Sequence, residues 1–389
     1  MKIAILFERL QNVHLLKDVG MVPYLLGKAM ACDTEIVGYR NDVDYPYLKS
    51  PLTDLRAHFI GDRFVSRWRT YPWLWKNARE IDVLILFHIC TPSIYQGLIY
   101  KLRNPSGYLY LKADIATEQV GYARLFQKNL LSSLKCFLLA KALMAKIDLV
   151  SVECSRTFQK VRAIPKEKLI HIPNGFWAGL ADYYRVARRP FAAKENRILL
   201  VARHGSYEKN SELMLDALRL IPFSSLAGWE VCFVGTATEA FRQEFLRFQA
   251  DRTDLANQVS LVGELTDKKA LLELYAGSKL LILPSRKDSF PLVCCEALYF
   301  GNALIMTREL TSSVDLTDGE RAGLVFNNEN AGDLADKLMA LLSDSATLKK
   351  MCEHAGEYAG QHLVWETIVA RLAARIQDDF VRQGKRVES

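Results

Sequence analysis

Two carboxylates lie eight residues apart in a segment that changes from apolar to polar. Residues 280–283 form an apolar run, Asp288 follows in a polar turn, and Glu296 comes two helical turns later. Ionised carboxylates only accept hydrogen bonds, so this pair suits the hydroxyl groups of a ribose or a hexose. If the apolar run is a parallel strand, both side chains lie near its carboxyl edge, where α/β proteins bind ligands. The spacing alone also fits an acidic helix cap followed by a buried structural glutamate.

Two cations form a second candidate site upstream. Arg203 follows the apolar run 198–202, Gly205 allows a turn, and Lys209 precedes an amphipathic stretch that contains Leu213 and Leu218. A helix N-terminus presents free N–H groups and a positive dipole end, so two added cations would suit a diphosphate. Either cation alone would more often be a solvated surface residue.

Short apolar runs alternate with helical stretches along the whole chain, which predicts parallel sheets flanked by helices. In the first half we expect strands at 2–7, 34–39, 83–87, 108–111, 149–152 and 169–172. In the second half we expect strands at 198–202, 230–234, 259–262, 280–283, 303–306 and 323–325. A chain of 389 residues is too long for one ordinary core. The fold class predicted is α/β, with two doubly wound domains.

Composition narrows the class of protein. Half of the residues are hydrophobic and 24% are charged, which is typical of a globular protein. We expect neither a signal peptide nor a membrane span, because the chain enters an apolar strand directly and has no uncharged apolar run long enough to cross a bilayer. The eight cysteines form no C-x-x-C pair and predict reduced thiols in a cytoplasmic protein.

Positive charge is concentrated in the first half. Residues 1–190 contain 28 Lys and Arg against 16 Asp and Glu, whereas the remainder contains 23 against 28. The segment 119–147 has no acidic residue and carries basic residues at helical spacing, namely Arg124, Lys128, Lys135, Lys141 and Lys146. This pattern indicates a basic amphipathic surface for an anionic membrane. A core helix whose lysine stems merely cover apolar surface is the alternative.

The segment around the two carboxylates resembles the E-x7-E motif of retaining GT-B glycosyltransferases, in particular the large fourth family, also called glycosyl transferases group 1. The matching residues are Ser285, Arg286, Phe290, Leu292, Glu296, Ala297 and Gly301. Asp288, Ser289 and Ala303 depart from the motif, which has Glu, Gly and Pro there. The segment with Arg203, Lys209 and Asn210 is similar to the family's V-G-R-x-x-x-x-K-[GN] motif. The resemblance covers most of the chain, strongly from Val201 to Gly323.

The resemblance implies roles for these residues. Arg203 and Lys209 would bind the donor diphosphate and act in catalysis, Asp288 would contact the transferred sugar, and Glu296 would bind the ribose. Ser289, Phe290 and Leu292 would complete the donor segment. Gly20, which stands where the family has a glycine-rich loop, would let the main chain approach the donor.

The resemblance also implies the domain order. Residues 1–184 would form an acceptor-binding domain and 197–362 a nucleotide-sugar-binding domain, facing each other across a cleft and joined by a linker at 185–196. Residues 363–389 would form a helix that returns to the first domain. Family members often have a histidine near the reacting sugar, for which His88 is the candidate. Lys112 and Asp114, one strand later, are further candidates for the acceptor site, and one sequence does not decide between the three.

The sequence lacks the motifs of several other classes of enzyme. The sequence lacks a G-x-G-x-x-G fingerprint, a Walker motif, H-E-x-x-H and G-x-S-x-G. Asp42 and Asp44 form a D-x-D in a polar loop, which is more typical of a turn than of a metal site. We therefore expect no cofactor and no metal in the chemical step.

These observations predict a retaining glycosyltransferase that moves a sugar from a nucleotide-diphosphate sugar to a saccharide or lipid-linked saccharide. A role in bacterial envelope polysaccharide synthesis and a cytoplasmic place, peripheral on the inner face of the membrane, follow from the same reasoning. A nucleotide-sugar epimerase, a phosphorylase and a binding protein without transferase activity are alternatives. Nucleic-acid binding is disfavoured, because no recognised module accompanies the basic, Trp-rich segment 63–79.

Overall fold

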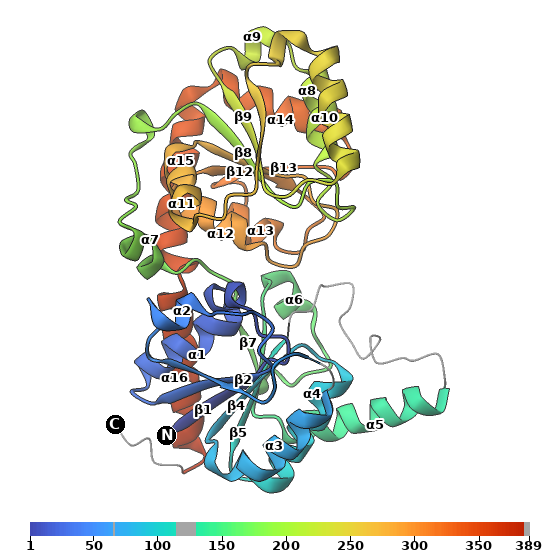
Figure 1. Ribbon diagram of the computed structural model, residues 1–389, viewed down its shortest axis with the longest axis vertical. Coiled ribbons are helices and arrows are strands. Elements are labelled where there is room, and N and C mark those ends of the chain that lie inside the picture. Colours follow the sequence, from blue (N-terminus) through green and yellow to red (C-terminus); the bar gives the residue numbers. More distant parts are fainter. Residues whose placement is uncertain (65–66, 114–129, 385–389) are drawn as a thin grey trace. The chain divides into compact units, whose positions relative to one another are not determined.

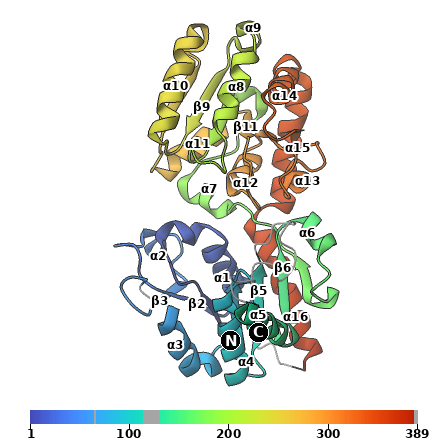
Figure 2. The same cartoon turned by 90° about the vertical axis from the view of Figure 1, so that its right-hand side faces the viewer.

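The computed structural model describes residues 1–64, 67–113 and 130–384. They form two compact units, shown in Figures 1 and 2. Unit 1 contains residues 1–177 and the C-terminal helix α16 (Trp365–Arg382), and unit 2 contains residues 178–364. Each unit is built on its own parallel sheet.

Unit 1 has a seven-stranded sheet of order β3-β2-β1-β4-β5-β6-β7. Its strands are β1 (Lys2–Leu6), β2 (Asp33–Gly38), β3 (Leu55–Phe59), β4 (Val83–Phe87), β5 (Tyr108–Ala113), β6 (Leu149–Val152) and β7 (Leu169–His171). Its other helices are α1 (Asp18–Ala29), α2 (Pro46–Lys49), α3 (Thr70–Asn77), α4 (Thr91–Arg103), α5 (Leu130–Lys146) and α6 (Ser155–Lys160).

Side-chain alternation along β5 shows how helices cover both faces of this sheet. The Tyr108 hydroxyl donates to Asp379 of α16 at 2.6 Å, whereas Leu109 packs with Ile94 of α4 and Leu143 of α5. Neighbouring residues of a strand point to opposite faces. Helices α1 and α16 therefore lie on one face, and α3, α4 and α5 pack side by side on the other.

Unit 2 has a six-stranded sheet of order β10-β9-β8-β11-β12-β13. Its strands are β8 (Arg197–Val201), β9 (Glu230–Val234), β10 (Val259–Gly263), β11 (Leu280–Leu283), β12 (Ala303–Thr307) and β13 (Gly323–Phe326). Its helices are α7 (Ala178–Tyr184), α8 (Glu212–Leu220), α9 (Phe223–Leu226), α10 (Glu239–Asp251), α11 (Lys268–Gly277), α12 (Leu292–Tyr299), α13 (Ser313–Thr317), α14 (Ala331–Ser343) and α15 (Ser345–His362).

The fold class predicted from the sequence, two doubly wound α/β domains, is confirmed, and so is each of the expected strands to within one or two residues. The edge strand β3 was not predicted. Arg56 and His58 interrupt its apolar pattern, and they can do so because an edge strand stays partly exposed.

The expected linker 185–196 packs against unit 2. Arg188 donates to the carbonyl of Gly356 at 3.0 Å and lies over the ring of Tyr299. Lys194 is buried and donates to the carbonyls of Ser278 and Phe300 at 2.8 and 2.7 Å. These contacts place the expected linker inside unit 2, which begins at residue 178.

Candidate functional site

The two predicted donor loops meet at the point where the strand order of unit 2 reverses. Strand β8 has β9 on one side and β11 on the other, so the loops after β8 and β11 leave the sheet next to each other. Such a reversal is where open α/β sheets bind ligands, outside the carboxyl ends of the strands. Arg203 and Lys209 lie in the first loop and Asp288 lies in the second.

Backbone geometry explains the residue types in the β8–α8 loop. Gly205 has φ +82°, and a Cβ there would lie 2.0 Å from Oγ1 of Thr238. Asn210 has φ +50°, a left-handed conformation that glycine and asparagine tolerate best. This strain accounts for the Gly or Asn of the motif that Lys209 precedes.

His204 anchors the β8–α8 loop to buried groups of unit 2. Its Nδ1 and Nε2 lie 2.8 Å from Oγ of Ser211 and 3.1 Å from the carbonyl of Val234, and its ring stacks on Phe241. Burial lowers the pKa of His204 to about 4, so the ring is neutral at pH 7. Arg203, its neighbour, is exposed, and the described residues offer its side chain no ion pair.

Hydrogen bonds tie the two donor loops together. The backbone N–H of Arg286 donates to the carbonyl of Glu208 at 2.8 Å, and its guanidinium donates to the carbonyl of Tyr207 at 2.8 Å. Lys209 forms an ion pair with Asp288, and both side chains are largely buried. Lys209, the residue predicted to bind the diphosphate, is thus in direct contact with Asp288, the residue predicted to bind the sugar.

Glu296 has a cation of its own, which the sequence reasoning missed. Nζ of Lys268, the first residue of α11, lies 2.6 Å from Oε1 of Glu296 on α12. Burial and, after it, the Glu296 carboxylate raise the pKa of Tyr275. A lysine in the first turn of a helix opposes the helix dipole, and this unfavourable position was the available signal.

The remaining residues of the donor segment lie around the start of α12. Leu292 is the first residue of the helix, and Ser289 and Leu292 are half-buried in the loop and the first turn. Phe290 is buried, so its ring packs inside the unit.

His88 lies at the corresponding reversal of strand order in unit 1, between β1 and β4. It is exposed and has φ +56°, a left-handed conformation in which histidine is enriched among non-glycine residues. A cavity of about 360 Å³ opens there, lined by His88, Glu8, Gln96 and neighbouring residues. The Gln96 amide donates to Glu8 at 3.1 Å, so a fixed carboxylate lines the same cavity.

Lys112 does not line this cavity. Its side chain is 0% exposed, and its Nζ contacts Asp18 at 3.0 Å, Glu153, and Oδ1 of Asn174 at 3.0 Å. Burial alone would lower the pKa of Lys112, but Asp18 and Glu153 raise it. The Lys112 side chain is thus closed off from solvent in this structure, and it contacts Asp18, whose side chain is partly exposed. Asp114 lies outside the described residues.

Gly20 has a structural reason for being glycine. It is buried in the first turn of α1, where a Cβ would lie 2.0 Å from the carbonyl oxygen of Leu15. The protein's own backbone thus fills the space of the missing side chain. This contact accounts for a glycine at position 20 without a bound nucleotide sugar.

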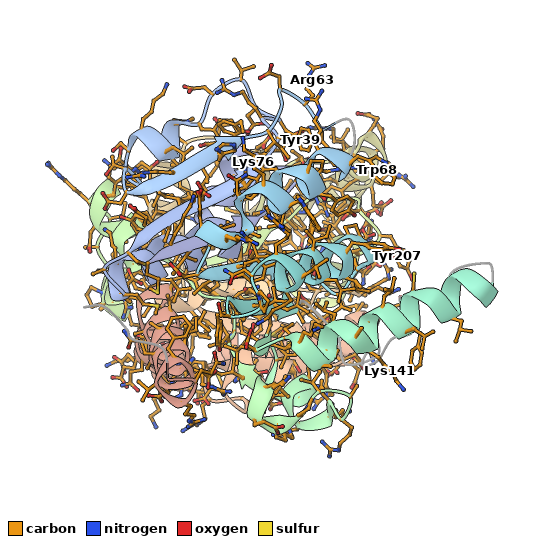
Figure 3. All side chains as sticks on the ribbon, turned by 90° about the horizontal axis from the view of Figure 1, so that it is seen from below. Tyr39, Arg63, Trp68, Lys76, Lys141 and Tyr207 are labelled. Carbon is orange, nitrogen blue, oxygen red and sulfur yellow. The ribbon has the colours of Figure 1, made fainter. Side chains whose placement is uncertain are left out.

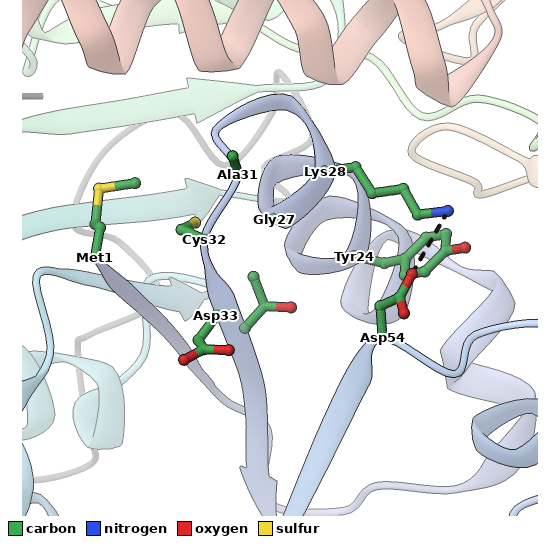
Figure 4. A pocket seen from close by; sticks show the side chains of 9 residues that line it. Met1, Tyr24, Gly27, Lys28, Ala31, Cys32, Asp33 and Asp54 are labelled. Atoms are coloured by element: carbon green, nitrogen blue, oxygen red, sulfur yellow. Dashed lines mark ion pairs between the residues drawn. The ribbon is translucent and has the colours of Figure 1, made fainter. Parts of the chain in front are cut away.

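Other parts of the described chain have weaker evidence for a ligand site. A cavity of about 460 Å³ lies at the amino edge of the first sheet, near Met1, Lys28 and Cys32 (Figure 4). This is the edge opposite to the one where α/β proteins bind ligands. Asp42 accepts a hydrogen bond from the backbone of Asn12 at 2.6 Å, so it connects its loop to the segment after β1. Within residues 1–64, 67–113 and 130–384, no cluster of three or more His, Cys, Asp or Glu residues has the geometry of a metal site.

Comparison with known proteins identifies the second unit. Residues 186–362 match the model of the family described as glycosyl transferases group 1. The matched range covers most of unit 2. The resemblance that the motifs of this segment indicated is thereby confirmed for these residues.

Two curated glycosyltransferases are similar to part of this chain, and an exopolysaccharide phosphotransferase of Streptomyces coelicolor is 26% identical over 62% of this chain and 25% of its own. An N,N'-diacetylbacillosaminyl-diphospho-undecaprenol α-1,3-N-acetylgalactosaminyltransferase of Campylobacter jejuni is 27% identical over 121 residues, which are 31% of each chain. A D-inositol 3-phosphate glycosyltransferase of Corynebacterium glutamicum is 31% identical over 29% of this chain and 27% of its own. The matches therefore span less than a third of these curated relatives.

The fold of the whole chain has relatives as well. The crystal structure of HepE of Anabaena in complex with UDP superimposes with a TM-score of 0.69 and 15% identity, over 97% of this chain and 100% of that one. At this level of identity the likeness supports the GT-B fold class and no more.

Proposed function

We propose that this protein is a retaining glycosyltransferase that uses a nucleotide-diphosphate sugar. The proposal is carried by four charged side chains in the loops after β8 and β11 and on α12. Arg203 and Lys209 would bind a diphosphate, Asp288 a sugar and Glu296 a ribose. These groups lie in the segment that matches the glycosyl transferases group 1 model. The family match favours sugar transfer over epimerisation and over inert binding.

The chemistry proposed breaks the bond between the anomeric carbon and the diphosphate and forms a bond from that carbon to an acceptor hydroxyl on the same face. Because the acceptor attacks from the face that the diphosphate leaves, the anomeric configuration is retained, and the departing phosphate oxygen takes the proton of the acceptor hydroxyl. Negative charge grows on the diphosphate during departure, and Arg203 and Lys209 would stabilise it in the transition state. This scheme assigns no step to a metal, so we expect activity to persist in EDTA.

The acceptor is proposed to be a saccharide or a lipid-linked saccharide bound to unit 1. The cavity near His88, with its fixed Glu8 carboxylate, has the groups that bind sugar hydroxyls. The relative in Campylobacter jejuni is named for a diphospho-undecaprenol substrate, which supports the lipid-linked alternative. An envelope polysaccharide role belongs to the same proposal.

An anionic membrane surface is the second partner proposed. One face of α5 packs in unit 1 through Cys136, Ala140 and Leu143, while Leu134 and Leu138 are 53% and 57% exposed on the rest of the helix. The same layer exposes Trp68, Trp75 and Leu102, and it carries Lys76 and Lys141 (Figure 3). Exposed leucines and tryptophans among lysines are typical of helices that lie on a membrane surface. Among the described residues, no helix is long and apolar enough to cross a bilayer.

The experiment that tests the proposed function uses the purified full chain and radiolabelled nucleotide sugars. The label should move into a lipid extract and move to water far more slowly, and NMR of the product should show the anomeric configuration of the donor. A labelled sugar that changes its stereochemistry without transfer would instead indicate an epimerase. Binding of the donor without either reaction would indicate a silent binding protein.

A further inference from the structure

The ion pair between Lys209 and Asp288 joins two groups that the proposed function assigns to different parts of the donor. Both side chains are about 20% exposed, so water screens the pair only in part. Lys209 comes from the loop after β8 and Asp288 from the loop after β11, and the backbone and side-chain hydrogen bonds of Arg286 to the first loop hold the loops together.

We propose that Asp288 and the donor diphosphate compete for Lys209, so that diphosphate binding releases Asp288 to the transferred sugar. This inference rests on the proposed function and adds an order of events to it. Diphosphate and carboxylate are both anions, and placing both on one ammonium group brings like charges within a few ångströms. The diphosphate wins the competition because Arg203 and the amino end of α8 add to its attraction.

Competition gives the site a preference for the intact donor over the free nucleotide diphosphate. With the intact donor, Asp288 exchanges its lysine for sugar hydroxyls, which donate to a carboxylate. With the free diphosphate, Asp288 loses its cation and gains no donor, and a largely buried carboxylate without a partner is costly. The product is therefore held less tightly than the donor.

The neighbouring pair of Lys268 and Glu296 provides the contrast. Its proposed ligand is a ribose, whose neutral hydroxyls do not compete for the ammonium group of Lys268. That pair can persist when the nucleotide binds, with the second carboxylate oxygen free to accept from the ribose. The two carboxylates should consequently affect nucleotide binding in opposite directions.

The test is calorimetric titration of the full chain with UDP, GDP and ADP. For the nucleotide that binds, Asp288→Asn should tighten the dissociation constant about fivefold, because it removes the competitor of the diphosphate. Glu296→Gln should weaken it about fivefold or more. The matched control is Glu244→Gln, which breaks a pair with Arg219 of similar exposure on α10 and α8 and should leave the dissociation constant unchanged.

A double-mutant cycle isolates the competition. In a Lys209→Met background, Asp288→Asn should no longer tighten nucleotide binding, since the shared cation is gone. Asp288→Ser serves as a second variant with the same expectation if the asparagine variant does not fold. Unchanged or weaker nucleotide binding in folded Asp288 variants overturns the competition. If none of the three nucleotides binds the wild-type protein, the proposed function itself fails, a result that differs from either outcome.

Discussion

Replacing Lys268 by methionine tests the role of a residue that no motif indicated. The change keeps an unbranched side chain one atom shorter and removes the charge that lies 2.6 Å from Glu296. The two side chains are 18% and 16% exposed, so the pair stands between surface pairs, worth at most about 1 kcal/mol, and buried pairs, whose disruption costs about 3–5 kcal/mol. We expect a loss of about 1.5 kcal/mol in nucleotide binding, or roughly tenfold in the dissociation constant.

The kinetic signature should be a higher KM for the donor with little change in kcat. The ribose does not change during transfer, so a ribose contact stabilises ground state and transition state equally. Lys268→Arg should restore most of the affinity, because a guanidinium also pairs with a carboxylate. The 2′-deoxy nucleotide should bind the wild-type protein more weakly than the ribonucleotide, and this difference should shrink in Lys268→Met. If Lys268→Met binds both nucleotides like the wild-type protein, Lys268 does not position Glu296 for a ribose.

Arg203→Ala should reduce kcat by at least ~10²-fold, since it removes a donor to the developing charge, while the exposed Arg247→Ala should leave kcat unchanged. Acidification should destabilise unit 2 through His204: its folded pKa of about 4 lies below the unfolded value of 6.5, so the unfolded chain binds more protons between these pH values and stability is lost as pH falls. Denaturant unfolding should show a loss of about 2 kcal/mol from this group between pH 7 and pH 5, and His204→Gln should lack that part of the pH dependence. In liposome flotation the protein should bind anionic vesicles at low salt and release them at about 0.5 M salt, where the screening length falls to a few ångströms. Binding should also weaken when Leu134 and Leu138 are replaced by serine. Vesicle binding that changes neither with salt nor with these substitutions would contradict the membrane surface proposed for α5.

The central strands could be predicted because burial on both faces leaves a continuous apolar run, as in Val83–Phe87 and Leu280–Leu283. The edge strand β3 could not, because its half-exposed residues carry no such run. The sequence predicted the type of sheet but not the order of its strands. The alternation of strands and helices predicts a doubly wound sheet, and the structure was needed to show which loops adjoin.

The donor residues were predictable where their roles depend on spacing within one loop. Arg203 and Lys209 share the loop after β8, and Asp288 and Glu296 share one strand–loop–helix segment. Lys268 was not predictable in this way, because it reaches Glu296 from a separate loop, and only the packing of α11 against α12 brings the two together. Lys112 misled the sequence reasoning for the opposite reason: its position at a strand end suggested access, whereas the two carboxylates around it compensate a fully buried charge.

Helix α16 has a consequence for how the chain matures. It packs against α1 and covers β5, with Trp365, Leu372 and Ile376 buried, yet it follows all of unit 2 in the sequence. At the ordinary pace of a ribosome, the whole of unit 2 takes roughly 10–40 s to synthesise. During that time the α1 side of the first sheet lacks its cover, while unit 2 already gains all of its strands. Unit 1 is thus begun first and completed last, and a nascent chain would need protection for the apolar surface that α16 finally covers.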